Sequence, residues 1–250
     1  MFLSAKSIYK SYGKGFGNNR QQVLKDINFY IKEGECVGLI GESGSGKSTL
    51  SRLILGLEKY ESGTLTIEDK SIKAWIKENK GKMSVVFQDY TSSANPNFTV
   101  KEVILEPLKA LGEKFNLDDK VKNLLEQVGL STDIIDRYPH ELSGGQLQRV
   151  CIARAISTKP RFMVLDEAIS SLDVSIQTQI LELLKRLKEE LNMTYLFIAH
   201  DLQAVTYLCD RIIFLYKGEI VENINNEGLG NTKNAYAKKL LNSVMPFNID

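Results

Sequence analysis

The stretch GESGSGKS, from Gly41 to Ser48, constrains the fold of this chain more than any other feature of its sequence. It satisfies the pattern GxxxxGK[ST], which is specific when a strand precedes it and a helix follows it. An apolar run over residues 35–41 comes before it, and a helical pattern over residues 47–57 comes after it, with Gly56 near its end. In that helix four apolar side chains would share one face: Leu50, Leu53, Ile54 and Leu57. We therefore predict a strand, a phosphate-binding loop and a helix in succession.

The residue types of this loop suit a chain of phosphate groups. Its glycines let backbone N–H groups converge on phosphate oxygens, and the helix N-terminus adds a partial positive charge. Lys47 adds a full positive charge, and the hydroxyl of Ser48 can be a ligand of Mg²⁺. The sequence therefore predicts a site for a nucleoside triphosphate with Mg²⁺. Its candidate residues are Gly41, Ser43, Gly44, Ser45, Gly46, Lys47, Ser48 and Thr49.

A second apolar run, FMVLDE at residues 162–167, ends in two adjacent carboxylates. Side chains alternate between the two faces of a strand, so one carboxylate can reach the metal while its neighbour addresses another group. We assign Asp166 to Mg²⁺ and Glu167 to the water that would attack the terminal phosphorus. Loss of Glu167 is then expected to stop turnover and to leave nucleotide binding intact.

Two further polar residues follow predicted strands. His200 ends the run TYLFIA, and ligands of parallel α/β sheets collect at the carboxyl ends of strands, so we place it beside the same phosphate. Gln88 follows the run SVVF at the entrance to a helical block, where its amide can touch the metal or the attacking water. Both are candidate catalytic residues, and Gln88 is also a candidate metal ligand.

The order of apolar patterns predicts one α/β domain with an inserted helical block. Short apolar runs separated by turns predict a hairpin-rich β layer in the first part of the chain. Helical patterns fill residues 89–155, and strands alternating with helices follow, which implies a mostly parallel sheet and a final strand pair turned at Lys217-Gly218. The β layer and core then comprise residues 1–88 and 156–222, and residues 223–250 form a polar tail with a peripheral helix.

Composition narrows the classes of function. The 250 residues include 32 Lys and Arg against 31 Asp and Glu, a formal charge of +1, so no global basic field attracts nucleic acid. The three cysteines form no CxxC pair, which argues against a disulfide framework or a zinc site. No apolar run approaches the ~18 residues of a membrane helix, and the N-terminus lacks the pattern of a signal peptide. We expect a cytosolic protein that contacts a membrane only through partners.

The stretch LSGGQ, residues 142–146, looks like a second phosphate site at a helix start, but it lacks a lysine. It belongs to the helical block beyond Gln88, so it cannot easily reach the nucleotide held by Lys47. Such a half-site makes sense if a second subunit presents its own phosphate loop across a two-fold interface.

The motifs GESGSGKST, Gln88, LSGGQ, FMVLDE, SSLD at residues 170–173 and His200 occur in the order found in ABC-transporter ATP-binding cassettes. The sequence resembles that family over nearly its whole length. The resemblance implies a P-loop NTPase core of the RecA-like type, with an antiparallel β subdomain and an inserted α-helical subdomain. It also implies a head-to-tail pair of cassettes with two ATP molecules between them, each touched by one P-loop and the opposite LSGGQ.

The same resemblance implies roles for further residues. Asp173 would communicate across the interface of the pair, and Tyr12 matches the aromatic side chain that stacks on adenine. Tyr9 and Phe16 are nearby alternatives to Tyr12. Ser143 and Gly145 would contact the γ-phosphate held by the opposite subunit. The residues implied at that opposite nucleotide are Ser143, Gly144, Gly145 and Gln146.

The segment FQDYTSSANPNFTVKEVILEPL, residues 87–108, resembles the peptide/nickel importer branch of the family. The sequence DEA at residues 166–168, where most peptide importers have DEP, and an end at Asp250 favour a short nickel-type or metal-chelate cassette. The branch implies a related ATPase as hetero- or homodimer partner, two membrane permease subunits and an extracytoplasmic solute-binding protein. It would place the chain at the cytoplasmic face of the cell membrane, with nickel, a metal chelate or a peptide as the cargo.

One alternative belongs to a different class, an ABC ATPase that serves DNA repair or translation. Repair proteins of this family split the cassette with a long coiled coil, and translation factors carry two cassettes in one chain. The sequence shows neither feature. The importer interpretation therefore stands first, with the cargo open.

Overall fold

The computed structural model of the chain describes residues 1–13 and 20–244. Phe16, one of the alternatives to Tyr12, lies outside the described residues. The chain divides into two units, the first with Met1–Glu78 and Thr194–Asp250, the second with Asn79–Met193. The P-loop, which we define as residues 41–48, belongs to the first unit, and LSGGQ belongs to the second.

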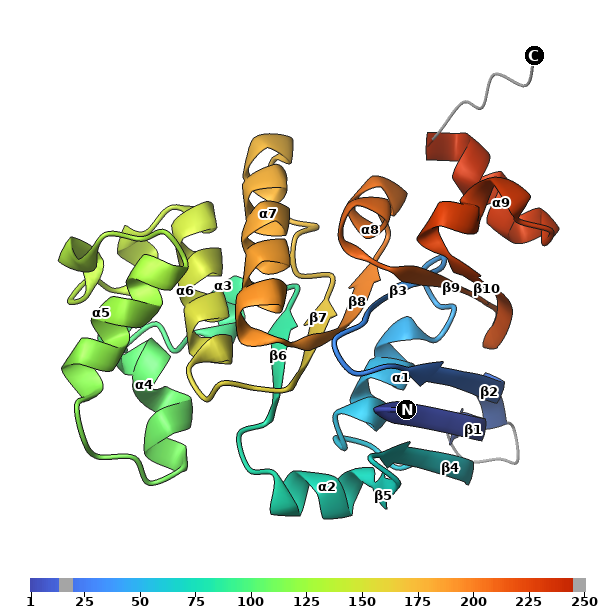
Figure 1. Ribbon diagram of the computed structural model, residues 1–250, viewed down its shortest axis with the longest axis horizontal. Coiled ribbons are helices and arrows are strands. Elements are labelled where there is room, and N and C mark those ends of the chain that lie inside the picture. Colours follow the sequence, from blue (N-terminus) through green and yellow to red (C-terminus); the bar gives the residue numbers. More distant parts are fainter. Residues whose placement is uncertain (14–19, 245–250) are drawn as a thin grey trace. The chain divides into compact units, whose positions relative to one another are not determined.

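The first unit contains an antiparallel sheet with the strand order β2-β1-β4-β5. Buried residues alternate with exposed ones along its second strand, where Ile27, Phe29 and Ile31 point into the core. Helix α1 (Lys47–Ile54), which follows the P-loop, contacts that strand, and the two lie side by side in Figure 1. The strands are β1 (Leu3–Gly13), β2 (Arg20–Ile31), β4 (Ser62–Ile67) and β5 (Lys70–Ser71).

The first unit also contains a parallel strand set, in which β3 pairs with β8 on one side and with β9 on the other. Strands β3 and β8 are buried at every residue, as expected for parallel strands covered on both faces. Strand β10 pairs antiparallel with β9, and the predicted turn between them is confirmed, with φ of 48° at Lys217 and 83° at Gly218. The strands are β3 (Cys36–Ile40), β8 (Thr194–Ala199), β9 (Arg211–Tyr216) and β10 (Glu219–Asn225).

Two further helices of the first unit pack beside these strands. Helix α8 (Leu202–Leu208) contacts β3 and β8, and helix α9 (Ala235–Val244) contacts α8 and β10. A 3₁₀ segment, η3 (Asn226–Asn231), connects β10 to the last helix. Cys36 and Cys209 are buried in this unit without a disulfide between them, and the Sγ of Cys36 donates a hydrogen bond to the Sγ of Cys209 at 3.4 Å.

The segment after the P-loop helix differs from the sequence prediction. Helix α1 ends at Ile54, and Leu57, which we placed on its apolar face, lies beyond the helix with 64% of its surface exposed. Gly56 has a φ of 71°, a left-handed conformation that ends the helix, as glycines often do. A short helix that the sequence did not predict, α2 (Ile72–Glu78), packs against β4 and β5.

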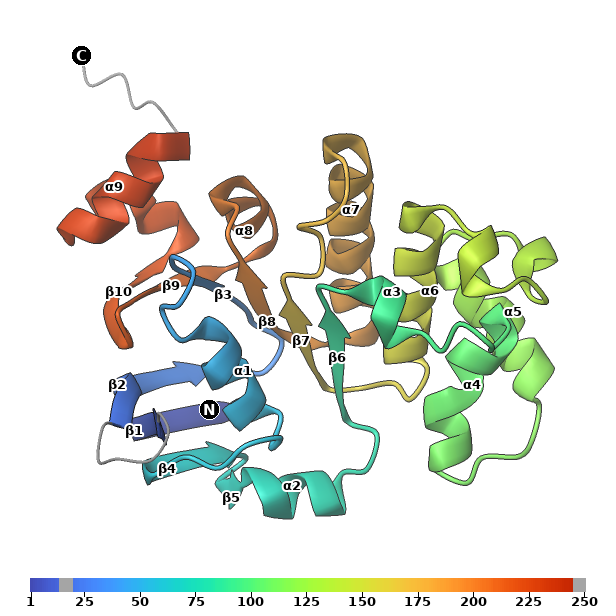
Figure 2. The ribbon, with the colours of Figure 1, turned by 180° about the vertical axis from the view of Figure 1, so that it is seen from behind.

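The second unit combines a parallel strand pair with helices. Strand β6 pairs in parallel with β7. Helices α4, α5 and α6 contact one another, and they lie side by side in Figure 2. Their apolar faces pack in the core of this unit, across the residues 89–155 for which the sequence predicted helices. The elements are β6 (Met83–Phe87), α3 (Tyr90–Ser93), α4 (Val100–Ala110), α5 (Leu117–Gln127), η1 (Thr132–Ile134), η2 (Pro139–Glu141), α6 (Gly144–Ile156), β7 (Phe162–Asp166) and α7 (Val174–Leu191).

Side-chain caps explain where three of these helices begin. Thr99 and Glu102 form a capping box at the start of α4, and Asp173 accepts a hydrogen bond from a first-turn N–H at the start of α7. Ser143 forms the corresponding capping box with Gln146 at the start of α6. The LSGGQ stretch is therefore a well-defined helix N-terminus.

Among residues 1–13 and 20–244, no helix combines the length and the apolar character that crossing a bilayer would require.

Candidate nucleotide site

The glycines of the P-loop serve two different purposes. A Cβ added at Gly41 would lie 2.2 Å from the carbonyl oxygen of Leu215, so this position needs glycine for a close approach to β9. A Cβ added at Gly44 would meet nothing within 4 Å, and its φ is 78°. The loop is therefore closely packed at its start and open beside Gly44.

The lysine of the loop lies inside it. Lys47 is 4% exposed, and its Nζ donates hydrogen bonds to the carbonyl oxygens of Gly41 at 2.7 Å and Glu42 at 3.1 Å. Both acceptors are neutral, so a phosphate entering the loop would be a stronger partner for the ammonium group. Ser45 is also buried, and its Oγ has no hydrogen-bond partner among the residues that the structure describes. A buried cation and an unsatisfied hydroxyl fit a bound polyphosphate.

Neighbouring elements hold the loop in this conformation. The N–H of Gly218, in the turn after β9, donates to the carbonyl oxygen of Ser45 at 3.0 Å. A Cβ added at Gly46 would lie 2.7 Å from Leu24 Cδ2 on β2, and the φ of Gly46 is 110°. The turn predicted at Lys217-Gly218 therefore supports the phosphate-binding loop directly.

His200 lies at the same strand end as the P-loop. The Cα of Ile40 is paired with that of Ala199, so Gly41 and His200 follow directly from paired residues of neighbouring parallel strands. His200 is exposed. The structure therefore places His200 next to the start of the P-loop, and its contact with a phosphate stays a prediction.

Tyr12 is held in place by charged neighbours. It lies at the end of β1 with 36% of its surface exposed, and its hydroxyl donates to Glu58 Oε2 at 2.5 Å. The hydrogen bond from Tyr12, together with nearby Lys10 and Arg52, lowers the pKa of the Glu58 carboxyl, so that this acceptor is ionised at neutral pH. Lys10 Nζ lies 4.9 Å from the centroid of the Tyr12 ring. The ring is thus an oriented, exposed aromatic surface.

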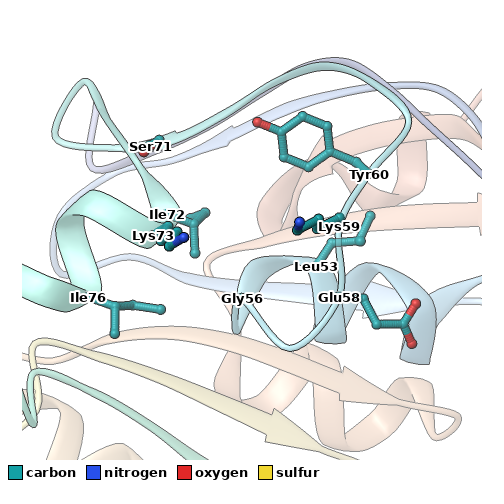
Figure 3. A pocket seen from close by; sticks show the side chains of 9 residues that line it. All are labelled: Leu53, Gly56, Glu58, Lys59, Tyr60, Ser71, Ile72, Lys73 and Ile76. Carbon is teal, nitrogen blue, oxygen red and sulfur yellow. The ribbon is translucent and has the colours of Figure 1, made fainter.

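A pocket of about 550 Å³ opens between the segment after α1 and helix α2 (Figure 3). Gly56 sits in its wall, where an added Cβ would lie 3.1 Å from Ile76 and 3.2 Å from Ile72. The lining residues are Leu53, Gly56, Glu58, Lys59, Tyr60, Ser71, Ile72, Lys73 and Ile76. None of them belongs to the predicted nucleotide site, and we assign the pocket no role in binding the nucleotide.

In the second unit, the strand register places Gln88 and Glu167 at corresponding positions. Phe87 is paired with Asp166, so Gln88 and Glu167 each follow directly from a paired residue of the parallel strands β6 and β7. Asp166 and Glu167 are half-buried, and Gln88 is exposed. The structure therefore brings the two predicted carboxylates and the predicted glutamine to one strand end.

Glu167 has an unusual backbone conformation. Its φ is 53°, which for a residue other than glycine costs on the order of 1 kcal/mol. Its carbonyl oxygen accepts hydrogen bonds from the N–H of Ser170 at 3.1 Å and from the Oγ of Ser170 at 2.9 Å. Ser170, the first serine of SSLD, therefore stabilises the backbone of Glu167, the predicted general base.

Gln148 is a residue of this region that sequence reasoning missed. It is fully buried on α6, and its Nε2 donates to the carbonyl oxygen of Ala168, the residue after Glu167, at 2.6 Å. The orientation of its amide follows from chemistry, because a carbonyl can only accept. A glutamine two residues after LSGGQ gave no signal of this contact in the sequence, since the partner is 20 residues away.

The LSGGQ stretch packs against the beginning of α7. A Cβ added at Gly145 would lie 3.0 Å from Ile176, and one added at Gly144 would lie 2.8 Å from the hydroxyl of Tyr90. Ser143 is exposed, and its Oγ accepts from the N–H of Gln146 at 3.3 Å, which leaves its own proton available for a ligand. A Cβ at either glycine would therefore require the side chain of Tyr90 or Ile176 to shift.

Asp173 has a structural role that the resemblance did not indicate. Its carboxylate accepts from the N–H of Ile176 at 3.0 Å and from the hydroxyl of Ser175 at 2.7 Å. The bond from the Ile176 N–H contributes most to lowering the pKa of Asp173, which stays ionised at the start of α7.

A second residue that the sequence did not indicate is Tyr236, in the tail that we described as peripheral. Its hydroxyl accepts a hydrogen bond from the N–H of Glu42, inside the P-loop, at 2.9 Å.

The buried lysine in its glycine loop, the Asp-Glu pair after a buried strand and the LSGGQ helix start define an ATP-binding cassette. A family model described as ABC transporter matches residues 24–170. The chain belongs to the ABC transporter family, and it is an ATPase of that family.

Curated relatives match the chain almost from end to end. The metal-staphylopine import system ATP-binding protein CntF of Staphylococcus aureus (strain NCTC 8325 / PS 47) is 45% identical, over 98% of this chain and 100% of its own length. The oligopeptide transport ATP-binding protein OppF of Streptococcus pyogenes serotype M1 is 42% identical, over 97% of this chain and 81% of its own length.

Solved structures confirm the predicted fold class. The ATP-binding cassette MJ0796, in a dimeric post-hydrolysis state with ADP and Pi, has a TM-score of 0.79 and 31% identity, covering 90% of this chain and 98% of its own. The protein cbiO1 from Clostridium perfringens, part of an ABC transporter complex, has a TM-score of 0.79 and 28% identity, covering 98% of this chain and 96% of its own.

Proposed function

We propose that this chain is the ATP-hydrolysing subunit of an importer whose cargo is a metal chelate, nickel or a peptide. The observation that carries the proposal is the match over 98% of the chain to the ATP-binding protein of a metal-staphylopine import system. The match to an oligopeptide transport ATPase keeps a peptide cargo open. Because the cargo passes through membrane subunits, the residues of this chain do not contact it. The chain would act at the cytoplasmic face of the membrane through permease partners, alongside a solute-binding protein.

The roles that we propose within the nucleotide site follow from the chemistry of each group. Lys47 and the backbone N–H groups of the P-loop bind the phosphates, and Glu167 accepts the proton of the attacking water. His200, at the strand end next to Gly41, acts on the terminal phosphate. The Ser143 hydroxyl donates a hydrogen bond to the γ-phosphate held by a second subunit. This chain pairs with that subunit head to tail. The whole set of residues proposed to bind nucleotide is Tyr12, Gly41, Ser43, Gly44, Ser45, Gly46, Lys47, Ser48, Thr49, Ser143, Gly144, Gly145, Gln146 and Asp173.

The residues proposed for Mg²⁺ are Ser48, Gln88 and Asp166. They offer hydroxyl, amide and carboxylate oxygens, the hard donors that this ion prefers. When bound, Mg²⁺ would neutralise negative charge on the phosphates of ATP. Few protein ligands are needed because Mg²⁺ also takes oxygens from phosphate and water.

Replacing Tyr12 with alanine is expected to weaken ATP binding by about fivefold to a hundredfold, because stacking of a base on an aromatic ring contributes about 1–3 kcal/mol. Tyr12→Phe keeps the ring, loses only the bond to Glu58, and should bind ATP within about tenfold of the unchanged chain. Titration with inorganic tripolyphosphate, which has no base, is the control and should be insensitive to either change. Equal weakening for ATP and tripolyphosphate would show that Tyr12 does not stack on adenine.

Purification of the tagged chain from membranes tests the transport function. We expect permease subunits and a related ATPase to co-purify, and Lys47→Ala to retain them, since partner binding does not require ATP turnover. Stable association with ribosomes or DNA in place of permeases would contradict the importer proposal and favour a role in translation or repair.

A deletion strain distinguishes the cargoes. Uptake of nickel and of metal chelates is measured beside uptake of small peptides, with the unchanged gene and a Glu167→Gln gene returned in parallel. We expect the unchanged gene alone to restore uptake of one cargo class. Normal uptake of all of them in the deletion strain would argue against import by this chain.

A further inference from the structure

Helix α9 is fixed firmly to the rest of the first unit. Ala237 is fully buried and Leu241 is 3% exposed, so its apolar face is covered. Asn234 Oδ1 accepts from the N–H of Tyr236 at 2.9 Å, and Glu222 Oε2 accepts from the N–H of Asn234 at 2.8 Å. The backbone that carries Tyr236 is therefore held by β10 and by its own N-terminal turn.

The ring of Tyr236 packs on the element that supports the P-loop. Its centroid lies 4.2 Å from that of Tyr216, with an angle of 31° between the ring planes. Tyr216 is the last residue of β9, directly before the turn whose Gly218 N–H donates to Ser45. The phenol therefore rests on the same strand end that holds the other side of the loop.

The hydroxyl of Tyr236 completes the hydrogen bonding of one peptide group. The peptide between Gly41 and Glu42 has its N–H bonded to Tyr236 Oη at 2.9 Å and its carbonyl oxygen bonded to Lys47 Nζ at 2.7 Å. Burial contributes most to raising the pKa of Tyr236, so the phenol is neutral at physiological pH and brings no negative charge toward a phosphate.

We propose that Tyr236 is a positioning residue for ATP binding, which holds the first peptide of the P-loop while Lys47 exchanges its carbonyl partner for phosphate. When Lys47 turns to the nucleotide, the carbonyl of Gly41 loses a charged partner, and the bond from Glu42 to Tyr236 keeps this peptide in its binding orientation. A loop ordered before the ligand arrives loses less entropy on binding. The inference rests on the proposed binding of ATP at the P-loop, and it gives helix α9 a part in that site.

The test compares two variants that each remove one hydroxyl. Tyr236→Phe keeps the ring and its packing but loses the bond to Glu42, and Tyr216→Phe removes a hydroxyl from the neighbouring ring and leaves that bond in place. We expect ATP to bind about threefold to tenfold more weakly to Tyr236→Phe and equally well to Tyr216→Phe. Unchanged affinity in Tyr236→Phe, or equal weakening in both variants, would overturn the inference.

Amide hydrogen exchange provides a second readout, measured on the unchanged chain and on Tyr236→Phe. The Glu42 N–H of the nucleotide-free, unchanged chain should be protected from exchange, and it should exchange faster in Tyr236→Phe while the core of β3 stays protected. Rapid exchange of Glu42 in the unchanged chain would contradict the contact. A merely structural role would lower the unfolding temperature of Tyr236→Phe and leave its ATP affinity intact, which also counts against the inference.

The two proposals fail in different ways. Absence of permease subunits from the purified material would contradict the importer function and would leave the ATP affinity unchanged. Normal ATP affinity in Tyr236→Phe would contradict the positioning role alone. If the unchanged chain bound no ATP, the inference would fall with its premise.

Discussion

Replacing Glu167 with glutamine is expected to reduce ATP hydrolysis by about a hundredfold to ten-thousandfold while ATP still binds, because the amide keeps the shape of the carboxylate but cannot accept the proton of water. We expect the local backbone to keep its conformation, since the carbonyl oxygen of Glu167 that accepts from Ser170 is unchanged by the substitution. Phosphate release measures turnover. Size-exclusion chromatography with ATP measures the fraction of the chain that forms a pair of cassettes. The pair should persist longer in the variant because ATP is not consumed.

The matched control is Glu182→Gln, an exposed glutamate on α7 in the same unit. It makes the same chemical change away from the strand end and should hydrolyse ATP at the normal rate. If Glu167→Gln also turned over ATP normally, another group would have to act as the general base.

Ser143→Asp is expected to weaken ATP-dependent pairing of the cassettes by at least about a hundredfold. A carboxylate about 4 Å from a phosphate charge is repelled by roughly 4 kcal/mol at the effective dielectric constant of a protein surface. Aspartate caps helices as well as serine does, so the start of α6, where Ser143 now caps Gln146, should remain intact. The measurement is the mass of the ATP-bound species in the Glu167→Gln background, where hydrolysis does not interfere.

Ser143→Asn separates charge from size, because asparagine has the shape of aspartate and caps equally well. It should pair much better than Ser143→Asp, and binding of ATP to the single chain should be the same in both. If Ser143→Asp paired as strongly as Ser143→Asn, Ser143 would not face a partner's triphosphate.

Much of the nucleotide site could be predicted because its signals are local. The P-loop pattern needs only a strand, a glycine-rich turn and a helix that are neighbours in the chain, and the structure has them at residues 36–54. His200 could be placed because ligands of parallel sheets collect at the carboxyl ends of strands, and the register that pairs Ile40 with Ala199 puts it beside Gly41.

Two other features were beyond such reasoning, one because a local turn overrides the helical period and one because its partner is far away in the chain. The helical period of apolar residues continues through Leu57, but the left-handed turn at Gly56 ends helix α1 at Ile54. The spacing of apolar residues does not show that a turn ends the helix before the apolar pattern stops. The contact of Gln148 could not be predicted either, because its buried amide bonds to Ala168, which only the folded chain brings next to it.

The sequence alone predicted the family of this chain, through the order of its short motifs. It also predicted the P-loop and the carboxylates proposed for hydrolysis, because each of these motifs consists of residues that are neighbours in the chain. Only the folded chain decided which side chains hold those groups in place. Tyr236 lies 194 positions from Glu42 in the sequence, yet its hydroxyl bonds the P-loop. A single hydrogen bond between distant segments leaves no periodic or compositional trace, so tertiary packing alone reveals it.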